Sequence, residues 1–306
     1  MKAVISTIFQ TGPWKEKQIF KCNHMKKHIL ITTMLIAGTI SAFADGKVVT
    51  DSIESRILNT SVTYNAYLPD GFETGDKVYP VIYLLHGLYG TYEDWQKNTG
   101  MNVIANELIQ SGEACEAVII MPNAGGGDIH NIHNGYFNVE GWAYEDFFFE
   151  ELIPTLEKKY RCIGDKAHRA IMGLSMGGGG STVYCQRHPD MFSSCYAMSA
   201  WLDTKFSEEM PHDAFYLTVK SVRNASPFDF IDNADAETIA ALKTVKWFFD
   251  CGDDDGLVYL SVDLHRKYNE HGIANELRVH NGAHTWEYWH NCLRDALPFA
   301  SRNFGK

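Results

Sequence analysis

The stretch His168-Arg169-Ala170-Ile171-Met172-Gly173-Leu174-Ser175-Met176-Gly177-Gly178-Gly179-Gly180 decides the fold. A short apolar run leads into a G-x-S-x-G pattern, and the segment 181–187 that follows can be helical. This order of strand, tight turn and helix is the context that a nucleophile elbow requires. A Cβ at either flanking glycine would collide with a neighbouring strand or helix, because the turn is crowded and its serine strained. The pattern therefore predicts Ser175 Oγ at the carboxyl end of a sheet, with the Met176 N–H beside it at a helix N-terminus.

The N-terminal segment has the pattern of an export signal. Residues 25–28 form a basic start, residues 29–42 are apolar, and Ala42-Phe43-Ala44 fits a cleavage site with small residues. The run is too short for a membrane anchor, so residues 1–44 are predicted to be a cleaved leader that starts at Met25. The expected location is therefore periplasmic or secreted.

The remaining residues, 45–306, have the composition and charge of an acidic globular domain. The whole chain has 306 residues, of which 45% are hydrophobic and 21% charged. Residues 45–306 carry 21 basic and 37 acidic side chains, because six Lys and one Glu lie in 1–44. So acidic a surface repels nucleic acid and anionic membranes, so neither is an expected partner. Six scattered cysteines remain, and most are expected to be buried free thiols.

Strand-like apolar runs alternate with helical segments along the rest of the chain. This alternation predicts an α/β fold with a mostly parallel sheet and helices on both faces, in one domain spanning 45–306. Residues 128–141 are expected to be a surface loop, and 202–243 a mostly helical insertion or cap. The other expected strands are 61–68, 81–85, 117–121, 191–198, 245–251 and 276–280, and the other expected helices are 101–110, 144–160, 257–271 and 286–302.

Three loops at the carboxyl ends of predicted strands carry candidate catalytic groups. In an open parallel sheet the active site lies beyond these ends. The loops are His86-Gly87-Leu88, Gly252-Asp253-Asp254-Asp255-Gly256, and Asn281-Gly282-Ala283-His284-Thr285-Trp286. An acid loop and then a histidine loop thus follow Ser175, in the order of an α/β-hydrolase triad.

This arrangement predicts nucleophilic catalysis by serine. His284 would take the proton of Ser175 during attack, and an aspartate would orient the imidazole. The backbone N–H groups of Leu88 and Met176 would hold the oxyanion. His86 and Gly87 are further candidates for contact with substrate.

Other interpretations compete at several of these positions. Two of the three aspartates 253–255 are expected to form only a solvated turn. His280 and His284 have a metal-like H-x-x-x-H spacing, but on a strand this spacing does not favour a shared metal, so neither metal nor cofactor is expected. His290 is expected to pack on a helix. Trp201 and Trp286 are candidates for lining the cleft, with core packing as the alternative.

The motifs together resemble a known family. His86-Gly87-Leu88, Gly173-Leu174-Ser175-Met176-Gly177-Gly178, Gly252-Asp253-Asp254-Asp255-Gly256-Leu257 and Gly282-Ala283-His284-Thr285-Trp286 are similar to the motifs of esterase D-type α/β-hydrolases. Within that group the chain resembles the bacterial feruloyl and acetyl xylan esterases of carbohydrate esterase family one. The resemblance implies an α/β-hydrolase fold, with Asp255 as the acid, His284 as the base, and Leu88 and Met176 as oxyanion donors.

The resemblance also sets the functional expectations. The first is a cofactor-free serine esterase that acts on a feruloyl (hydroxycinnamoyl) ester of plant cell-wall polysaccharide, or on a small aryl ester. Alternatives are an acetyl xylan or other short-acyl esterase and a siderophore esterase. A non-catalytic carbohydrate-binding protein on the same fold is the alternative from another class. The sequence leaves the acyl group, the sugar and the oligomeric state open.

Overall fold

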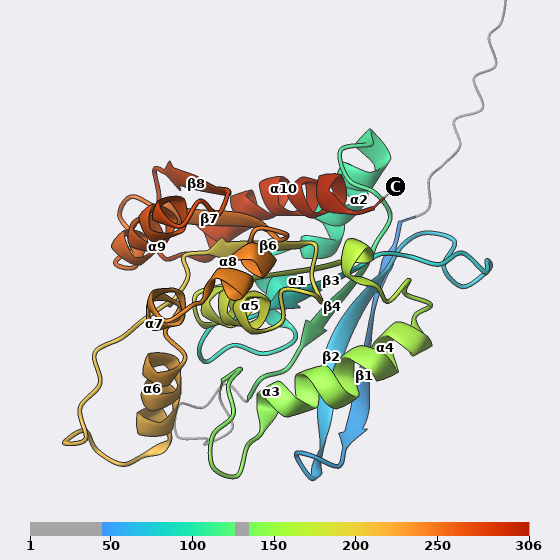
Figure 1. Cartoon of the computed structure of the whole chain (residues 1–306). Helices are drawn as coiled ribbons and strands as arrows, with labels where there is room; N and C mark the ends of the chain where they lie inside the picture. Colours follow the sequence, from blue (N-terminus) through green and yellow to red (C-terminus); the bar gives the residue numbers. More distant parts are fainter. Residues whose placement is uncertain (1–44, 126–134, 306) are drawn as a thin grey trace, which may run out of the picture. The chain divides into compact units, whose positions relative to one another are not determined.

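The computed structural model describes residues 45–125 and 135–305 (Figure 1). The predicted leader, residues 1–44, lies outside the described residues, and so does the first half of the predicted loop 128–141, residues 128–134. The described part of that loop includes Tyr136 and Phe137, which are both buried, so the prediction of a surface loop is wrong there.

The centre of the fold is one eight-stranded sheet in the order β1-β2-β4-β3-β5-β6-β7-β8. β2 pairs antiparallel with both of its neighbours, and every other pair of adjacent strands is parallel. This confirms the predicted α/β-hydrolase fold with a mostly parallel sheet. The strands are β1 (Lys47–Ser55), β2 (Thr60–Leu68), β3 (Val81–Leu85), β4 (Val118–Pro122), β5 (Arg169–Leu174), β6 (Ser194–Met198), β7 (Lys246–Gly252) and β8 (Asn275–His280).

Helices cover both faces of the sheet (Figure 1). Alternate residues of β3 enter different cores: Tyr83 packs into one hydrophobic cluster and Leu84 into the other, so this strand is apolar throughout. The cluster around Leu84 includes residues of α1 (Asp94–Thr99), α2 (Met101–Ser111) and α10 (Trp286–Asn303). The opposite cluster includes residues of α3 (Tyr144–Phe147), the π-helical turn η1 (Phe148–Leu152), α4 (Ile153–Lys159), α5 (Met176–Arg187), α6 (Ala214–Asn224), α7 (Pro227–Asp232), α8 (Ala236–Leu242) and α9 (Val258–Glu270).

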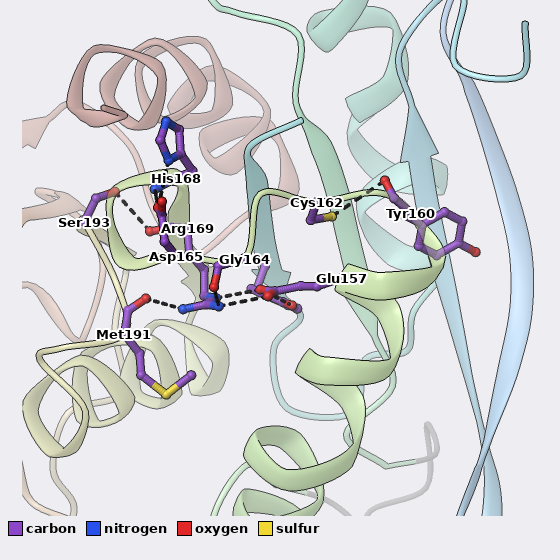
Figure 2. Close-up of polar contacts among 10 residues, drawn as sticks. Glu157, Tyr160, Cys162, Gly164, Asp165, His168, Arg169, Met191 and Ser193 are labelled. Carbon is purple, nitrogen blue, oxygen red and sulfur yellow. Dashed lines mark hydrogen bonds and ion pairs between the residues drawn. The ribbon is translucent and has the colours of Figure 1, made fainter. Parts of the chain in front are cut away.

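A buried ion pair fixes the amino end of β5, the end away from Ser175 (Figure 2). Arg169 donates to both carboxylate oxygens of Glu157 on α4, from Nε at 2.6 Å and from Nη2 at 2.9 Å. Its remaining N–H groups reach the carbonyl oxygens of Met191 and Gly164, and Tyr83 also donates to Glu157. Because this network satisfies both charges, it can join α4 to the sheet without leaving a buried charge unpaired.

Two further findings, on the cysteines and on membrane-spanning helices, concern the described residues. The six cysteines of the described residues are free, and Cys185, Cys195, Cys251 and Cys292 are buried, as predicted for most of them. Within 45–125 and 135–305 no helix combines the length and the apolar character needed to span a bilayer.

Candidate active site

Ser175 sits on a strained turn between β5 and α5. Its φ of 53° and ψ of −117° lie in a region that a non-glycine residue rarely adopts. Its backbone is held on both sides, since its N–H donates to Met198 O at 2.9 Å and its carbonyl accepts from Gly179 and Trp201. Such over-determination is what keeps a strained residue in place.

The glycines around Ser175 allow the backbone to approach very closely. A Cβ at Gly173 would lie 2.6 Å from the backbone of Gly177, and one at Gly177 would lie 2.5 Å from the carbonyl oxygens of Leu85 and His86. Further into the helix, a Cβ at Gly179 would lie 2.3 Å from the carbonyl oxygen of Trp201. A side chain at any of these positions would therefore collide with the backbone, as expected from the sequence, and glycine allows the elbow to pack against the loop after β3.

Two backbone N–H groups beside Ser175 are available to a ligand. Within residues 45–125 and 135–305, neither Leu88 nor Met176 donates its N–H to an intramolecular acceptor. Gly87 lies directly against the elbow, because a Cβ there would be 3.5 Å from Ser175 Cβ and 2.6 Å from a methyl group of Leu174. Two free donors near a candidate nucleophile are the components of an oxyanion hole.

His86 is buried beneath this loop, with only 1% of its surface exposed. Its Nε2 accepts from the Ala124 N–H at 2.9 Å, so the proton lies on Nδ1, which donates to Gly87 O at 2.8 Å. Burial lowers the pKa of His86, which favours this neutral form. Both ring nitrogens are thus occupied by backbone groups, an arrangement that favours a role in positioning the loop over the direct substrate contact considered from the sequence.

Asp255 and His284 meet at the ends of neighbouring strands. Nδ1 of His284 lies 2.8 Å from Oδ2 of Asp255, and Oδ1 accepts from the Leu257 N–H at 2.9 Å. Burial acts to raise the pKa of Asp255, but the hydrogen bonds from His284, Leu257 and Ser199 outweigh it and hold this pKa below its usual range. A buried carboxylate that stays ionised can fix the tautomer of the imidazole and stabilise its protonated form.

The structure separates Asp255 from the other two aspartates of its loop. Asp253 and Asp254 are exposed, whereas the Asp255 side chain is 1% exposed. Asp253 accepts from the Gly282 N–H at 2.9 Å and so joins the acid loop to the histidine loop. His290 donates from Nδ1 to the carbonyl oxygen of Thr99, the last residue of α1, at 2.8 Å, in agreement with the expected packing on a helix.

Two residues that the sequence did not single out support the His284 ring. The indole N–H of Trp289 donates to Ser199 Oγ at 3.0 Å, and the same indole packs edge-on against His284 with ring centroids 4.8 Å apart. Ser199 follows β6 directly, is fully buried, and has a φ of 44°. Its place after a strand end is the sequence signal that could have marked it.

The two candidate cleft tryptophans are both partly buried. Trp201 packs against the core, and its backbone N–H donates to Ser175 O. Trp286 packs edge-on against Trp95 and Trp289, with ring centroids 5.9 and 5.1 Å apart. Both therefore adjoin the candidate residues, and Trp286 supports the wall that carries Trp289.

The candidate groups lie in a row at the carboxyl ends of four neighbouring strands. β5, β6, β7 and β8 are adjacent and parallel, and Ser175, Ser199, Asp255 and His284 follow them in that order. Among the described residues no hydrogen bond joins Ser175 Oγ to His284, a contact that in many hydrolases tightens only when substrate binds. Nor does any group of three His, Cys, Asp or Glu side chains in this part of the chain have the arrangement of a metal site.

Comparisons with known proteins agree with this architecture. The model of the family Esterase, described as "Putative esterase", matches residues 55–300. A solved ferulic acid esterase is 45% identical, with a TM-score of 0.82 over 85% of this chain and 99% of that one.

Two relatives of known description match over different shares of their length. The endo-1,4-beta-xylanase/feruloyl esterase of Xylanibacter ruminicola is 33% identical over 134 residues, which are 42% of this chain and 18% of that protein. The chain thus spans less than a fifth of that relative. An acetyl esterase of Caldicellulosiruptor saccharolyticus is 22% identical over 81% of this chain and 96% of its own length. Taken together with the family match over most of the fold, these likenesses identify the chain as a member of the Esterase family, a carboxylic ester hydrolase with the α/β-hydrolase fold.

Proposed function

We propose that the chain is a serine esterase in which Ser175, His284 and Asp255 form the catalytic triad. The observation that carries the proposal is the contact between His284 and the buried Asp255 carboxylate. This pair follows the carboxyl ends of its strands, as the strained Ser175 does. Because Nδ1 of His284 faces the carboxylate, Nε2 is the atom left to act as the base.

The reaction proceeds through an acyl-enzyme. Ser175 Oγ attacks the carbonyl carbon of the ester while its proton passes to Nε2 of His284. The resulting oxyanion accepts hydrogen bonds from the N–H groups of Leu88 and Met176, each worth about 10²–10³ in rate. The C–O bond of the ester then breaks, and the alcohol leaves with the proton from Nε2. Water repeats the sequence on the acyl-enzyme, giving its proton to Nε2, and the carboxylic acid departs as Ser175 recovers its proton.

The proposed substrate is a hydroxycinnamoyl ester such as a feruloyl ester of plant cell-wall polysaccharide. Two relatives support this choice, the ferulic acid esterase at 45% identity and the bifunctional xylanase/feruloyl esterase. The second candidate is a short-acyl ester such as acetylated xylan, which the similarity to an acetyl esterase favours. The predicted leader at 1–44 places the activity outside the cytoplasm in this proposal.

The test compares methyl ferulate with an acetyl ester, using wild-type protein and the Ser175→Ala variant. We expect kcat/KM to favour methyl ferulate by more than about tenfold, which corresponds to about 1.4 kcal/mol of differential transition-state binding. A preference for acetate would indicate a small acyl pocket and a deacetylase. If neither ester were hydrolysed in a Ser175-dependent way, siderophore esters and non-catalytic carbohydrate binding would be the functions to test next.

A further inference from the structure

Tyr89 occupies a position in the loop after β3 that is unfavourable for a tyrosine. Residues 87–90 form a β-turn in which the Gly90 N–H donates to Gly87 O at 3.0 Å. Tyr89 is the third residue of this turn and has a φ of 63°, whereas Leu88 before it has a negative φ. These are the features of a type II turn, whose third position favours glycine or asparagine. A large side chain there is strained.

No side-chain hydrogen bond, aromatic contact or cation–π contact to the described residues compensates Tyr89 for this strain. The residue is 45% exposed and is one of the few exposed large hydrophobic residues of the described chain. Within residues 45–125 and 135–305 its ring has no aromatic or cationic partner, and its hydroxyl makes no hydrogen bond. None of these contacts among the described residues therefore explains a tyrosine at this position.

Among the described residues, the other non-glycine positions with positive φ each have a visible reason for it. Asn59 is one of the residue types that tolerate this conformation. Arg161 gains from its guanidinium group, which stacks 3.9 Å from the Phe72 ring centroid and donates to the carbonyl oxygens of Phe72 and Lys77. Ser175 and Ser199 belong to the candidate active site. Tyr89 is the remaining case, and it directly follows Leu88.

We propose that the Tyr89 ring is a specificity-determining contact, packing against a ring of the ester substrate. The inference rests on the proposed function, in which the preceding N–H, that of Leu88, holds the carbonyl oxygen. A side chain one residue away from that donor lies within reach of the groups attached to the same carbonyl carbon. An exposed aromatic face can pack against another aromatic ring or against the C–H face of a sugar ring. The ring it meets is either the aryl group of the acid or the sugar of the alcohol.

The test uses two variants that separate the ring from the turn. Tyr89→Asn keeps a residue suited to positive φ but removes the ring, whereas Tyr89→Phe keeps the ring. For Tyr89→Asn we expect kcat/KM for methyl ferulate to fall about tenfold, mainly through KM, while kcat/KM for methyl acetate stays within about twofold. Tyr89→Phe stays within about twofold on both esters. The urea midpoint of Tyr89→Asn is equal to or above that of wild type, because strain is relieved.

Asn59→Gly provides the matched control, since it changes an exposed residue of positive φ in the turn between β1 and β2. We expect no change in its kcat/KM for either ester. A loss in Tyr89→Asn that appeared only with a feruloylated arabinose ester would support the contact and assign it to the sugar. Unchanged kinetics on all esters, or an equal loss on methyl ferulate and methyl acetate, would overturn the proposal for Tyr89 alone. Absence of Ser175-dependent hydrolysis by wild type would instead refute the proposed function, and the role of Tyr89 with it.

Discussion

His284 and Asp255 are 29 residues apart in the sequence, yet His284 Nδ1 lies 2.8 Å from Asp255 Oδ2. The pairing of β7 with β8 brings them together, because each residue follows the carboxyl end of its strand. The acid loop and the histidine loop are also tied directly, through the Gly282 N–H and the Asp253 carboxylate. The relative placement of acid and base is thus fixed by the sheet itself.

Replacing Asp255 should abolish most of the activity without unfolding the protein. In Asp255→Asn we expect kcat to fall about 10⁴-fold, because the amide would favour the wrong tautomer of His284. The matched control is Asp254→Asn, which changes an exposed neighbour in the same loop and should leave kcat within about twofold. Steady-state kinetics on methyl ferulate measure both. Equal losses in the two variants would show that the loop, and not the Asp255 carboxylate, matters.

The pair formed by Ser199 and Trp289 should act through the orientation of His284. In Ser199→Ala the indole loses its hydrogen-bond acceptor and Asp255 loses one of the hydrogen bonds that favour its ionised form, so both neighbours of His284 are held less firmly. We expect kcat to fall about tenfold with KM little changed, as for the loss of a positioning contact made in the transition state. Ser193→Ala, at the other end of β6, removes a buried hydrogen bond to Arg169 O and should lower stability alone. An equal fall in kcat in Ser199→Ala and Ser193→Ala would refute a specific role for Ser199.

Buried His86 should make the protein less stable as the pH falls. The pKa of a histidine in the unfolded chain is about 6.5, whereas burial lowers the pKa of His86 in the folded protein. Between these two values the unfolded chain binds more protons, so the free energy of unfolding decreases as the pH drops below 6.5. Protonation would also deprive the Ala124 N–H of its acceptor at Nε2.

Urea unfolding at about pH 7.5 and about pH 5 would measure this effect, which for one group is at most about 1.4 kcal/mol per pH unit. In His86→Gln the difference in stability between the two pH values should shrink. His188, whose pKa burial also lowers, contributes in the same direction and should account for part of what remains. An unchanged difference in His86→Gln would contradict a neutral, buried His86.

The ion pair of Arg169 with Glu157 should matter for stability and not for chemistry. Arg169→Met leaves a buried carboxylate without its partner and should cost about 3–5 kcal/mol of the free energy of unfolding. The exposed pair of Lys47 with Glu73 is the control, since Glu73→Gln should change stability by less than about 1 kcal/mol. Chemical denaturation measures both, and kcat of the folded fraction should stay near that of wild type. A cost below about 1 kcal/mol for Arg169→Met would contradict the account of this network.

The elements predicted well from the sequence are those whose burial leaves a clear pattern. β3 has the predicted bounds, because a strand covered on both faces is apolar throughout. β1 was not predicted, since it is an edge strand whose residues are mostly exposed and polar. α1 was missed because its six residues are too few to show helical periodicity.

The glycines after Ser175 show a second limit. The helical pattern of the sequence covers only 181–187, whereas α5 runs from Met176 to Arg187 and includes all four glycines. Glycine weakens a helix, yet here tertiary contacts override that tendency. A Cβ at Gly178 would lie 2.9 Å from Ala200, and one at Gly180 would lie 3.0 Å from the Tyr136 ring. Such contacts come from distant segments, so local sequence does not reveal them.

The residues of the candidate site also fall into those that the sequence predicts and those that only tertiary contacts reveal. Ser175, Asp255 and His284 stand at strand ends within recognisable motifs, so the sequence could nominate them. Ser199 and Trp289 act through contacts between β6 and α10, which no motif records.

The most direct test of the account is to identify the atom that carries the acyl group. Wild-type protein mixed with methyl ferulate and quenched within the first turnovers should gain the mass of one feruloyl group, and peptide mapping should place it on Ser175. Ser175→Ala should gain no mass and hydrolyse no ester, whereas Asp255→Asn should gain the mass slowly. Acylation at another residue, or turnover that persists in Ser175→Ala, would contradict the proposed mechanism.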